Sequence, residues 1–263
     1  MTYKQLLKRY SVLRFKTFME YKASFMLGLL SSFISIIVTF LFWGTIYNYT
    51  NSINGWTFAQ IIMLQGFFHL FLGLFWIIFH FSEHMDELII NGGLDKFLSK
   101  PINPLIAYMF QKIDWFEIMQ VINAILYFWI AIQLGATIYW LNFIGAVAMI
   151  LLGCTILALI MVSIGCSSFW VGRTNSIMTV WNSIWEVGGY PITIFPYPAQ
   201  ILLTFGMPII FLQTYPSLLT MNQISWIFFM QIIITQLILI GIWFVISVYV
   251  WKKGLKRYSS YGG

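Results

Sequence analysis

The chain has 263 residues, of which 60% are hydrophobic and only 8% are charged. An ordinary soluble domain has roughly 25% charged residues, so this chain has too few to cover a water-facing surface. The composition excludes a soluble enzyme and a disordered chain, and it predicts an integral membrane protein. A membrane-crossing helix needs about 20 apolar residues, so the length accommodates six spans and no large domain outside the bilayer.

Residues 1–22 contain six Lys and Arg residues among apolar residues that recur at helical spacing. They lack the short apolar core and small-residue cleavage site of a signal peptide. The pattern predicts a helix that lies in the membrane interface with its basic face toward anionic headgroups. The alternative is a basic tail that only sets orientation.

Six apolar windows follow, each long enough to cross a bilayer. They are residues 24–47, 58–81, 115–136, 140–171, 175–195 and 225–251. Residues 196–224 are also apolar, but Pro196, Pro198, Pro208 and Pro216 prevent one continuous helix. We expect two short helices there that dip in from one side, covered by protein or lining a wet cavity.

All 14 Lys and Arg residues lie in four segments that alternate with the uncharged connections. The four segments are residues 1–23, 82–114, the turn near Arg173, and 252–263. Because basic residues remain on the cytoplasmic side, both termini are expected inside the cell. The sequence therefore predicts one all-α transmembrane domain over residues 1–263, with six spans.

The segment 82–105, after the second apolar window, is the longest inner connection between spans. Glu83, Asp86 and Glu87 are spaced to share one helix face, and the pair Gly92–Gly93 is expected to end that helix. Apolar periodicity then resumes until Pro101 and Pro104. Such an acidic and apolar helix could dock on a partner protein, or the segment could be a solvated connector; composition does not separate the two.

The run from Gly93 to Leu105 resembles the Gly-x-Leu-Asp-x-x-Leu-x-x-Pro-x-x-Pro-Leu signature of ABC-2 type transporter permeases. The run from Phe195 to Pro208, continuing to Pro216, also resembles that family. The resemblance covers the whole chain, and Lys100 stands where Arg is more usual, with the charge kept. It implies a dimeric bacterial exporter whose spans move when separate cytoplasmic ATPase subunits bind and hydrolyse ATP.

The resemblance also implies roles for particular residues. The inner segment would be the coupling helix, with ATPase contacts at Glu83, His84, Asp86, Glu87, Leu88, Gly93, Leu94, Asp95, Pro101 and Pro104. Spans 2 and 5 would line the translocation path, with Gln65, His69, Trp185 and Glu186. Since an ionised carboxylate in lipid is costly, the alternative for Glu186 is a carboxyl group bonded to a neighbouring span or placed near the outer mouth. For His69 the residues favour a structural role over one on the path.

No Gly-x-x-x-x-Gly-Lys-Ser/Thr loop occurs, so we expect no cofactor on this chain and place ATP and Mg on the partner ATPase. The other expected partners are the bilayer of the bacterial inner membrane and a second copy or a homologous permease; nucleic acid is not expected. The expected substrate is lipophilic or amphipathic. A passive channel or ion-driven carrier is the alternative. The chain has few charges inside the membrane, which argues against ion coupling.

His80-Phe-Ser-Glu83-His84 matches the His-x-x-Glu-His order of a class of zinc peptidases. A third ligand would have to come from Asp114, Glu117 or Glu186. The motif is short, and the inner end of a span is an ordinary place for His and Glu. The sequence therefore favours no metal site, and a membrane metallopeptidase ranks last among the functions considered.

Overall fold

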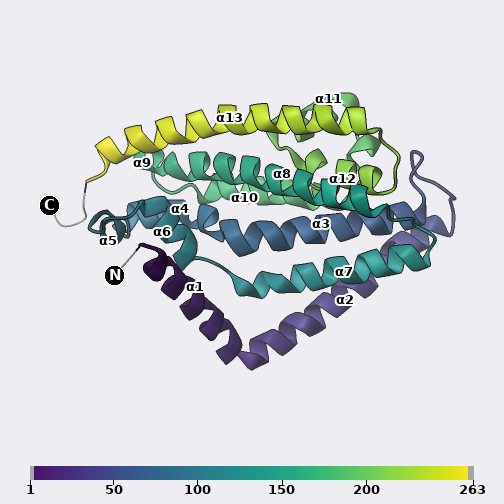
Figure 1. Ribbon diagram of the computed structural model, residues 1–263, viewed down its shortest axis with the longest axis horizontal. Helices are drawn as coiled ribbons and strands as arrows, with labels where there is room; N and C mark the ends of the chain where they lie inside the picture. The colour runs from purple at the N-terminus through teal and green to yellow at the C-terminus, as the bar shows by residue number, and fades with distance from the viewer. Residues whose placement is uncertain (1–2, 260–263) are drawn as a thin grey trace.

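The computed structural model describes residues 3–259, and within this range seven side chains lie outside the description. They belong to Tyr3, Lys4, Leu6, Asn175, Ser176, Asn182 and Glu186. Within the described residues, five helical segments are long and apolar enough to cross a membrane, and they run side by side as an elongated bundle (Figure 1). The prediction of an all-α membrane protein is confirmed.

The five long segments are built on helices α2 (Lys22–Tyr47), α3 (Phe58–Phe79), α7 (Ile118–Gln133), α8 (Trp140–Cys166) and α13 (Trp226–Arg257). Shorter elements extend or join them. These are α1 (Tyr3–Glu20), η1 (His80–His84), α4 (Met85–Ile90), α5 (Asp95–Leu98), α6 (Pro104–Gln111), η2 (Trp115–Glu117), α9 (Ser168–Val171), α10 (Asn175–Trp185), η3 (Glu186–Gly189), η4 (Ile192–Ile194), α11 (Tyr197–Ile201), η5 (Leu202–Gly206), η6 (Ile209–Phe211) and α12 (Thr214–Thr220).

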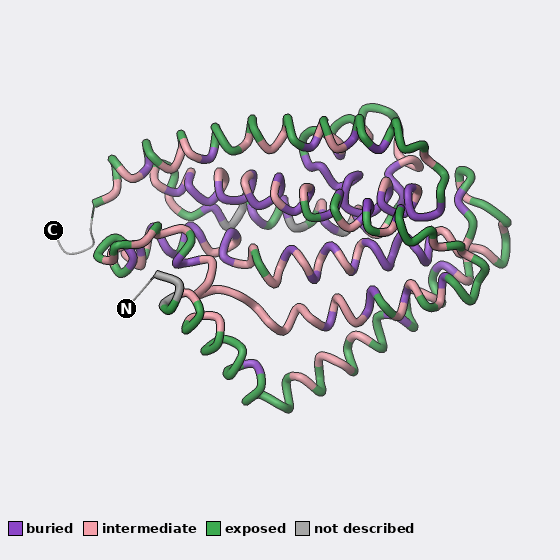
Figure 2. The backbone as a smooth tube through the Cα atoms, in the orientation of Figure 1, coloured by how far each residue is buried: buried purple, intermediate pink, exposed green. Residues whose placement is uncertain are grey.

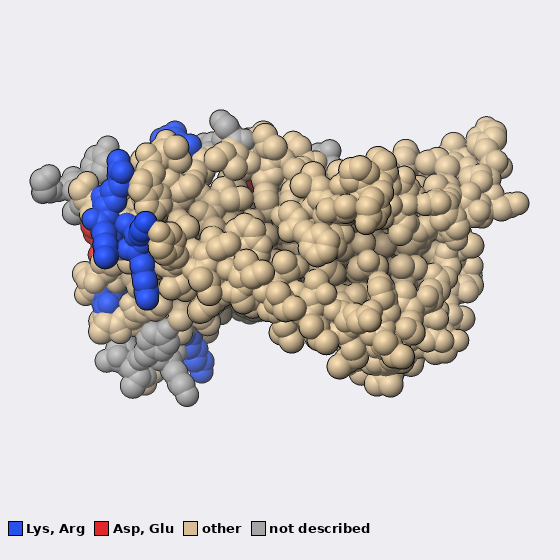
Figure 3. Space-filling model, turned by 90° about the horizontal axis from the view of Figure 1, so that it is seen from above, with Lys and Arg blue, Asp and Glu red and all other residues tan. Residues whose placement is uncertain are grey.

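Lys and Arg side chains gather at one end of the bundle, as the face in Figure 3 shows. We call this the basic end; it contains α1, the segment from η1 to α6, the turn at Arg173 and the last turns of α13. The opposite, uncharged end holds the connections 48–57, 134–139 and 221–225, which contain no Asp, Glu, Lys or Arg. The alternation of basic and uncharged connections along the sequence therefore becomes a separation in space.

Helix α1 meets α2 at Tyr21, and the two form a V on one side of the bundle (Figure 1). The inner side of α1 packs through aromatic contacts, with Phe18 against Phe116 at 5.0 Å between ring centroids. Leu13 of α1 is 60% exposed. Helix α1 thus docks by its aromatic residues and leaves an apolar and basic face uncovered.

The fifth apolar window, 175–195, does not form the single long helix that we expected. Helix α10 has 11 residues and continues as the short 3₁₀ turn η3, which ends before Pro191. The segment nevertheless runs from one end of the bundle to the other. The backbone N–H of Thr174 bonds Asp86 at the basic end, and Thr193 accepts a bond from Trp56 Nε1 at 2.8 Å at the uncharged end. Two glycines and a proline in 188–191 explain the early end of the helix.

Residues 197–220 form two short helical arms bent by 77° at Pro208. Both outer ends of this pair lie at the uncharged end, since Thr193 contacts Trp56 and the carbonyl of Thr220 accepts the N–H of Tyr139 at 3.1 Å. The bend penetrates the bundle, where Leu212 packs against Gly153 halfway along α8, at a distance that leaves no room for a Cβ atom. The chain therefore enters and leaves on the same side.

Burial differs sharply between the long helices (Figure 2). In the most apolar window of α3 and its extension, 61% of residues are buried, against 6% in α2 and 17% in α13. Helix α3 forms the centre of the core, where Phe71 stacks on Trp185 with ring centroids 5.3 Å apart. The apolar outer faces of α2 and α13 are therefore available to lipid or to another protein.

Candidate functional site

The inner segment that follows α3 is packed firmly against the bundle. It contributes Phe81, Met85, Leu88, Ile89, Leu94 and Phe97 to a second hydrophobic cluster, which also contains Val162 and Cys166 of α8. Met85 is fully buried and packs on Gly165 of α8 so closely that a Cβ at Gly165 would collide with it. The segment therefore has a defined position relative to α8 and is not a loose connector.

Tyr108 of α6 holds the middle of this segment. Its hydroxyl donates a hydrogen bond to the carbonyl oxygen of His84 at 3.0 Å. Burial, assisted by the charges of Glu87 and Asp86, raises the pKa of Tyr108. The hydroxyl therefore remains protonated and able to donate.

Asp86 does not belong to the outward acidic face that we expected. Its side chain is buried, and its two oxygens accept backbone N–H groups of Glu87 at 2.7 Å and of Thr174 at 3.2 Å. Thr174 directly precedes α10. A carboxylate at this position satisfies N–H groups that a helix start leaves without an intrahelical partner. Asp86 therefore joins the inner segment to α10.

The predicted ATPase contacts divide into buried and accessible groups. Leu88 and Leu94 are buried in the chain's own core, whereas Glu87 and Pro101 are exposed. His84, Glu83, Gly93, Asp95 and Pro104 are partly exposed. Sequence reasoning missed several residues that the fold leaves on the outer surface of the segment. These are Asn91, Lys96, Leu98 and Ser99.

Pro104 begins a helix, in contrast to the expectation that it stops one. It occupies the first turn of α6, and Asn103 caps that helix by accepting the N–H of Leu105 at 3.0 Å. Proline suits this position because its missing N–H would have no partner there. Lys100, just before, donates to the hydroxyl of Tyr10 in α1 at 2.8 Å, so the exit of the segment is tied to the N-terminal helix.

The predicted translocation residues lie together along α3 and α10 but are packed closely. Gln65 Nε2 donates to the carbonyl of Gly189 at 2.7 Å, which joins α3 to the end of η3. The ring of His69 stacks on Tyr127, and its Nδ1 lies 2.7 Å from Gln120 Oε1. Trp185 stacks on Phe71. The structure does not describe the side chain of Glu186, so the role on the path stays a prediction for this residue.

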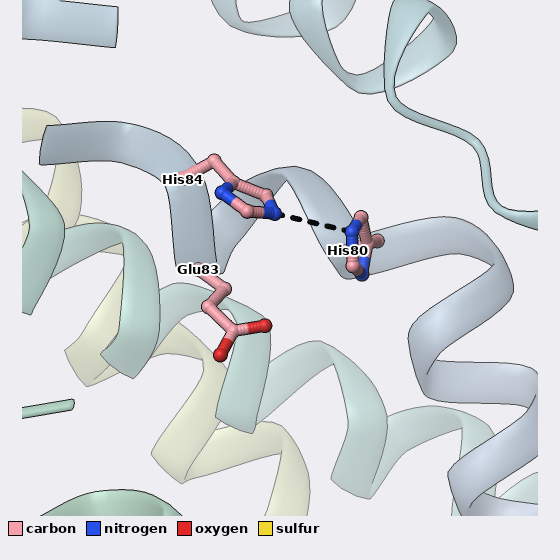
Figure 4. Close-up of side chains that lie close together, drawn as sticks. All are labelled: His80, Glu83 and His84. Carbon is pink, nitrogen blue, oxygen red and sulfur yellow. Dashed lines mark hydrogen bonds between the residues drawn. The ribbon is translucent and has the colours of Figure 1, made fainter. Parts of the chain in front are cut away.

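His80, Glu83 and His84 come together in η1, directly after the C-terminal end of α3 (Figure 4). One ligand atom from each lies within 4.8 Å of the others, and the two His Nε2 atoms are 3.2 Å apart. Asp114 and Glu117, considered as third ligands from the sequence, are not members of this group.

A bundle of long apolar helices with its charges at one end and a packed helical segment at that end defines a multi-pass membrane protein. The family model described as ABC-2 family transporter protein matches residues 33–262, and the chain belongs to this family. It is thus the membrane permease component of an ABC transporter, a transport subunit that works with an ABC ATPase component, as the sequence predicted. No curated protein sequence matches the chain.

Proposed function

We propose that this permease is an exporter that works as a homodimer or heterodimer with two cytoplasmic ATPase subunits. The ATPases bind ATP and Mg, and their nucleotide states favour different conformations of the permease. The whole chain acts as one transmembrane domain: residues 1–22 lie on the membrane surface, 82–105 couple to the ATPase, and 196–224 form a re-entrant segment. The basic end faces the cytoplasm of a bacterial cell, as the distribution of Lys and Arg favours.

The observation that carries this proposal is the double attachment of the inner segment. Met85 packs on Gly165 of α8, and Asp86 bonds the start of α10. Glu87, only one residue further on, is exposed. A partner that moves the outer surface of this segment therefore displaces α8 and α10 together.

The path for the substrate is proposed to open between α3 and the α10–η3 segment. The Gln65–Gly189 hydrogen bond and the Phe71–Trp185 stack close this seam in the described conformation. Both contacts are individually modest, on the order of 1 kcal/mol, so that differential ATPase binding can separate them. His69 and Glu186 would then contribute the polar groups of the path.

A lipophilic substrate suits the surfaces near the basic end. A groove of about 560 Å³ opens between α8 and α13 beside the inner segment. Leu159, Phe244, Val248 and Trp251 are among its apolar side chains, and Lys252 is the charged residue on its lining. Such a surface accepts hydrocarbon and could bind a negative headgroup at one edge.

The coupling proposal is tested with the permease and its ATPase purified together and reconstituted in lipid vesicles. Glu87→Lys combined with Leu98→Asp changes only outer residues of the inner segment. We expect reduced ATPase co-purification, or hydrolysis that substrate no longer stimulates. The matched control is Glu20→Lys, the same charge reversal on exposed α1. Normal association and normal stimulation in the double variant would contradict coupling through this surface.

A further inference from the structure

His80, Glu83 and His84 form a compact cluster of possible metal ligands at the junction of α3 and α4. The imidazoles project from the two ends of the η1 turn toward each other, and the carboxylate of Glu83 lies beside the pair (Figure 4). The sequence favoured ordinary boundary residues here. The structure adds the mutual orientation of three ligand groups, which sequence spacing alone does not give.

The distance between the two His Nε2 atoms matches a tetrahedral metal site. With Zn–N bonds of about 2.0–2.1 Å, two imidazole nitrogens on one tetrahedral zinc ion lie about 3.3–3.4 Å apart. The observed separation is 3.2 Å. Without an ion this contact is a hydrogen bond between one protonated and one unprotonated Nε2. An ion would take the place of the shared proton once each ring tilts so that both lone pairs converge on it, at nearly the same separation of the nitrogens.

The ring of His84 is also held in the orientation that metal ligands use. Its Nδ1 lies 3.3 Å from a carboxylate oxygen of Glu87. A carboxylate on one imidazole nitrogen favours the tautomer with the proton on Nδ1 and leaves the lone pair of Nε2 free to bind a metal. That Nε2 is the atom facing His80.

The donor atoms identify the class of ion. Two imidazole nitrogens and one carboxylate oxygen suit Zn²⁺ and similar transition metals, whereas Mg²⁺ and Ca²⁺ prefer sites made of oxygen atoms. His80 lines a hollow of about 280 Å³ together with Asp114, Lys112 and Arg14, so its ring can be reached from outside the bundle. Three protein ligands leave a fourth tetrahedral position for water.

We propose that His80, Glu83 and His84 bind one divalent ion of the zinc class, with Glu87 orienting His84. The ion would bridge the first and last residues of η1 and so fix the junction between α3 and α4. The proposal is independent of the exporter assignment. It departs from the expectation that this chain binds no cofactor.

The test uses the full chain, purified in detergent through a tag without histidine and stripped of metal with a chelator. Co²⁺ is titrated while its visible absorption is recorded, and Zn²⁺ is then added in competition. We expect one equivalent of Co²⁺ with a tetrahedral spectrum, displaced by Zn²⁺. His84→Ala and His80→Gln should abolish the spectrum, and Glu87→Gln should weaken Zn²⁺ binding by about 10- to 100-fold.

His69→Gln is the matched control, because His69 is the third of the three histidines and lies elsewhere on α3. It should bind Co²⁺ like the wild type. Size-exclusion profiles identify any variant that fails to fold. The proposal is overturned if the wild type shows no tetrahedral Co²⁺ spectrum, or if folded His84→Ala and His80→Gln variants retain it.

Discussion

The Asp86 carboxylate accepts a hydrogen bond from the backbone N–H of Thr174, at 3.2 Å and across 88 positions of sequence. This bond connects the first turn of α4 with the residue before α10. The acceptor is a buried carboxylate oxygen, so the bond contributes more to stability than a similar bond on the surface. Asp86, which the sequence placed among the ATPase contacts, thus has a structural role inside the bundle.

Removal of this carboxylate should destabilise the protein. Asp86→Ala leaves the N–H groups of Glu87 and Thr174 without their acceptor, at a cost of about 1.5–3 kcal/mol. We expect the melting temperature in detergent to fall by several degrees. Glu87→Ala is the control, since its exposed ion pair should contribute little. Equal melting temperatures for the two variants would contradict the role assigned to Asp86.

The contact between Gly165 and Met85 should tolerate no added methyl group. Gly165→Ala places a Cβ against buried Met85, and overpacking of this kind costs about 1–3 kcal/mol. Thermal unfolding measures the loss. Gly241→Ala in α13 is the matched control, because no atom lies within 4 Å of its new Cβ. It should be neutral or slightly stabilising, as glycine is less favourable than alanine within a helix.

Tyr108 should give the protein an alkaline dependence of stability. Burial, then the charges of Glu87 and Asp86, raise its pKa above the ordinary value of 10.0. The unfolded tyrosine ionises near that pH while the folded one stays protonated. The stabilising effect is therefore complete below pH 10 and decreases as the pH rises further.

Tyr108→Phe should lower the unfolding free energy at neutral pH by about 0.5–1.5 kcal/mol and weaken its fall above pH 10. Chemical unfolding at several pH values measures both effects. Tyr49→Phe, at a residue that is 90% exposed, should change neither. Wild-type stability of the Tyr108→Phe variant at neutral pH would contradict the stabilising bond, and a wild-type pH profile would contradict the raised pKa.

Cysteine labelling in intact cells should separate the two ends of the bundle. Asn51→Cys and Gln223→Cys, both at exposed positions of the uncharged end, should react with an impermeant maleimide. Ser99→Cys at the basic end should react only after the membrane is opened. Gln213→Cys is fully buried and should remain unlabelled, like native Cys154 and Cys166. Labelling of Ser99→Cys in intact cells would contradict the proposed orientation.

Much of the architecture could be predicted from the sequence because lipid exposure imposes long apolar windows. Four of the six windows became the long helices α2, α3, α8 and α13, and a fifth became η2 and α7. The prediction of one long helix over 175–195 was wrong, because apolar content does not reveal where a helix breaks. Gly188 packs on Phe68, and this tertiary contact accompanies the change from α-helix to 3₁₀ turn.

The candidate site was predicted less well. The spacing of Glu83, Asp86 and Glu87 gives a shared helix face only in a regular α-helix. Here η1 ends at His84, so Asp86 turns inward while Glu87 stays exposed. The partner of Asp86 is a backbone N–H group, which has no sequence signature. Long-range partners of this kind become visible only once the chain is folded.

Helix α8 connects the two ends of the molecule as a rigid rod. Leu212 of the bent segment 197–220 packs on it at Gly153, and Met85 of the inner segment packs on it at Gly165, 12 positions or about 18 Å apart along the axis. Neither contact leaves room for the packed side chain to slide along α8, so a displacement at one glycine is transmitted through α8 to the other. Energetic coupling of this kind is reciprocal. A small molecule that separated Leu212 from Gly153 at the uncharged end should therefore also disturb the packing of Met85 on Gly165 at the basic end.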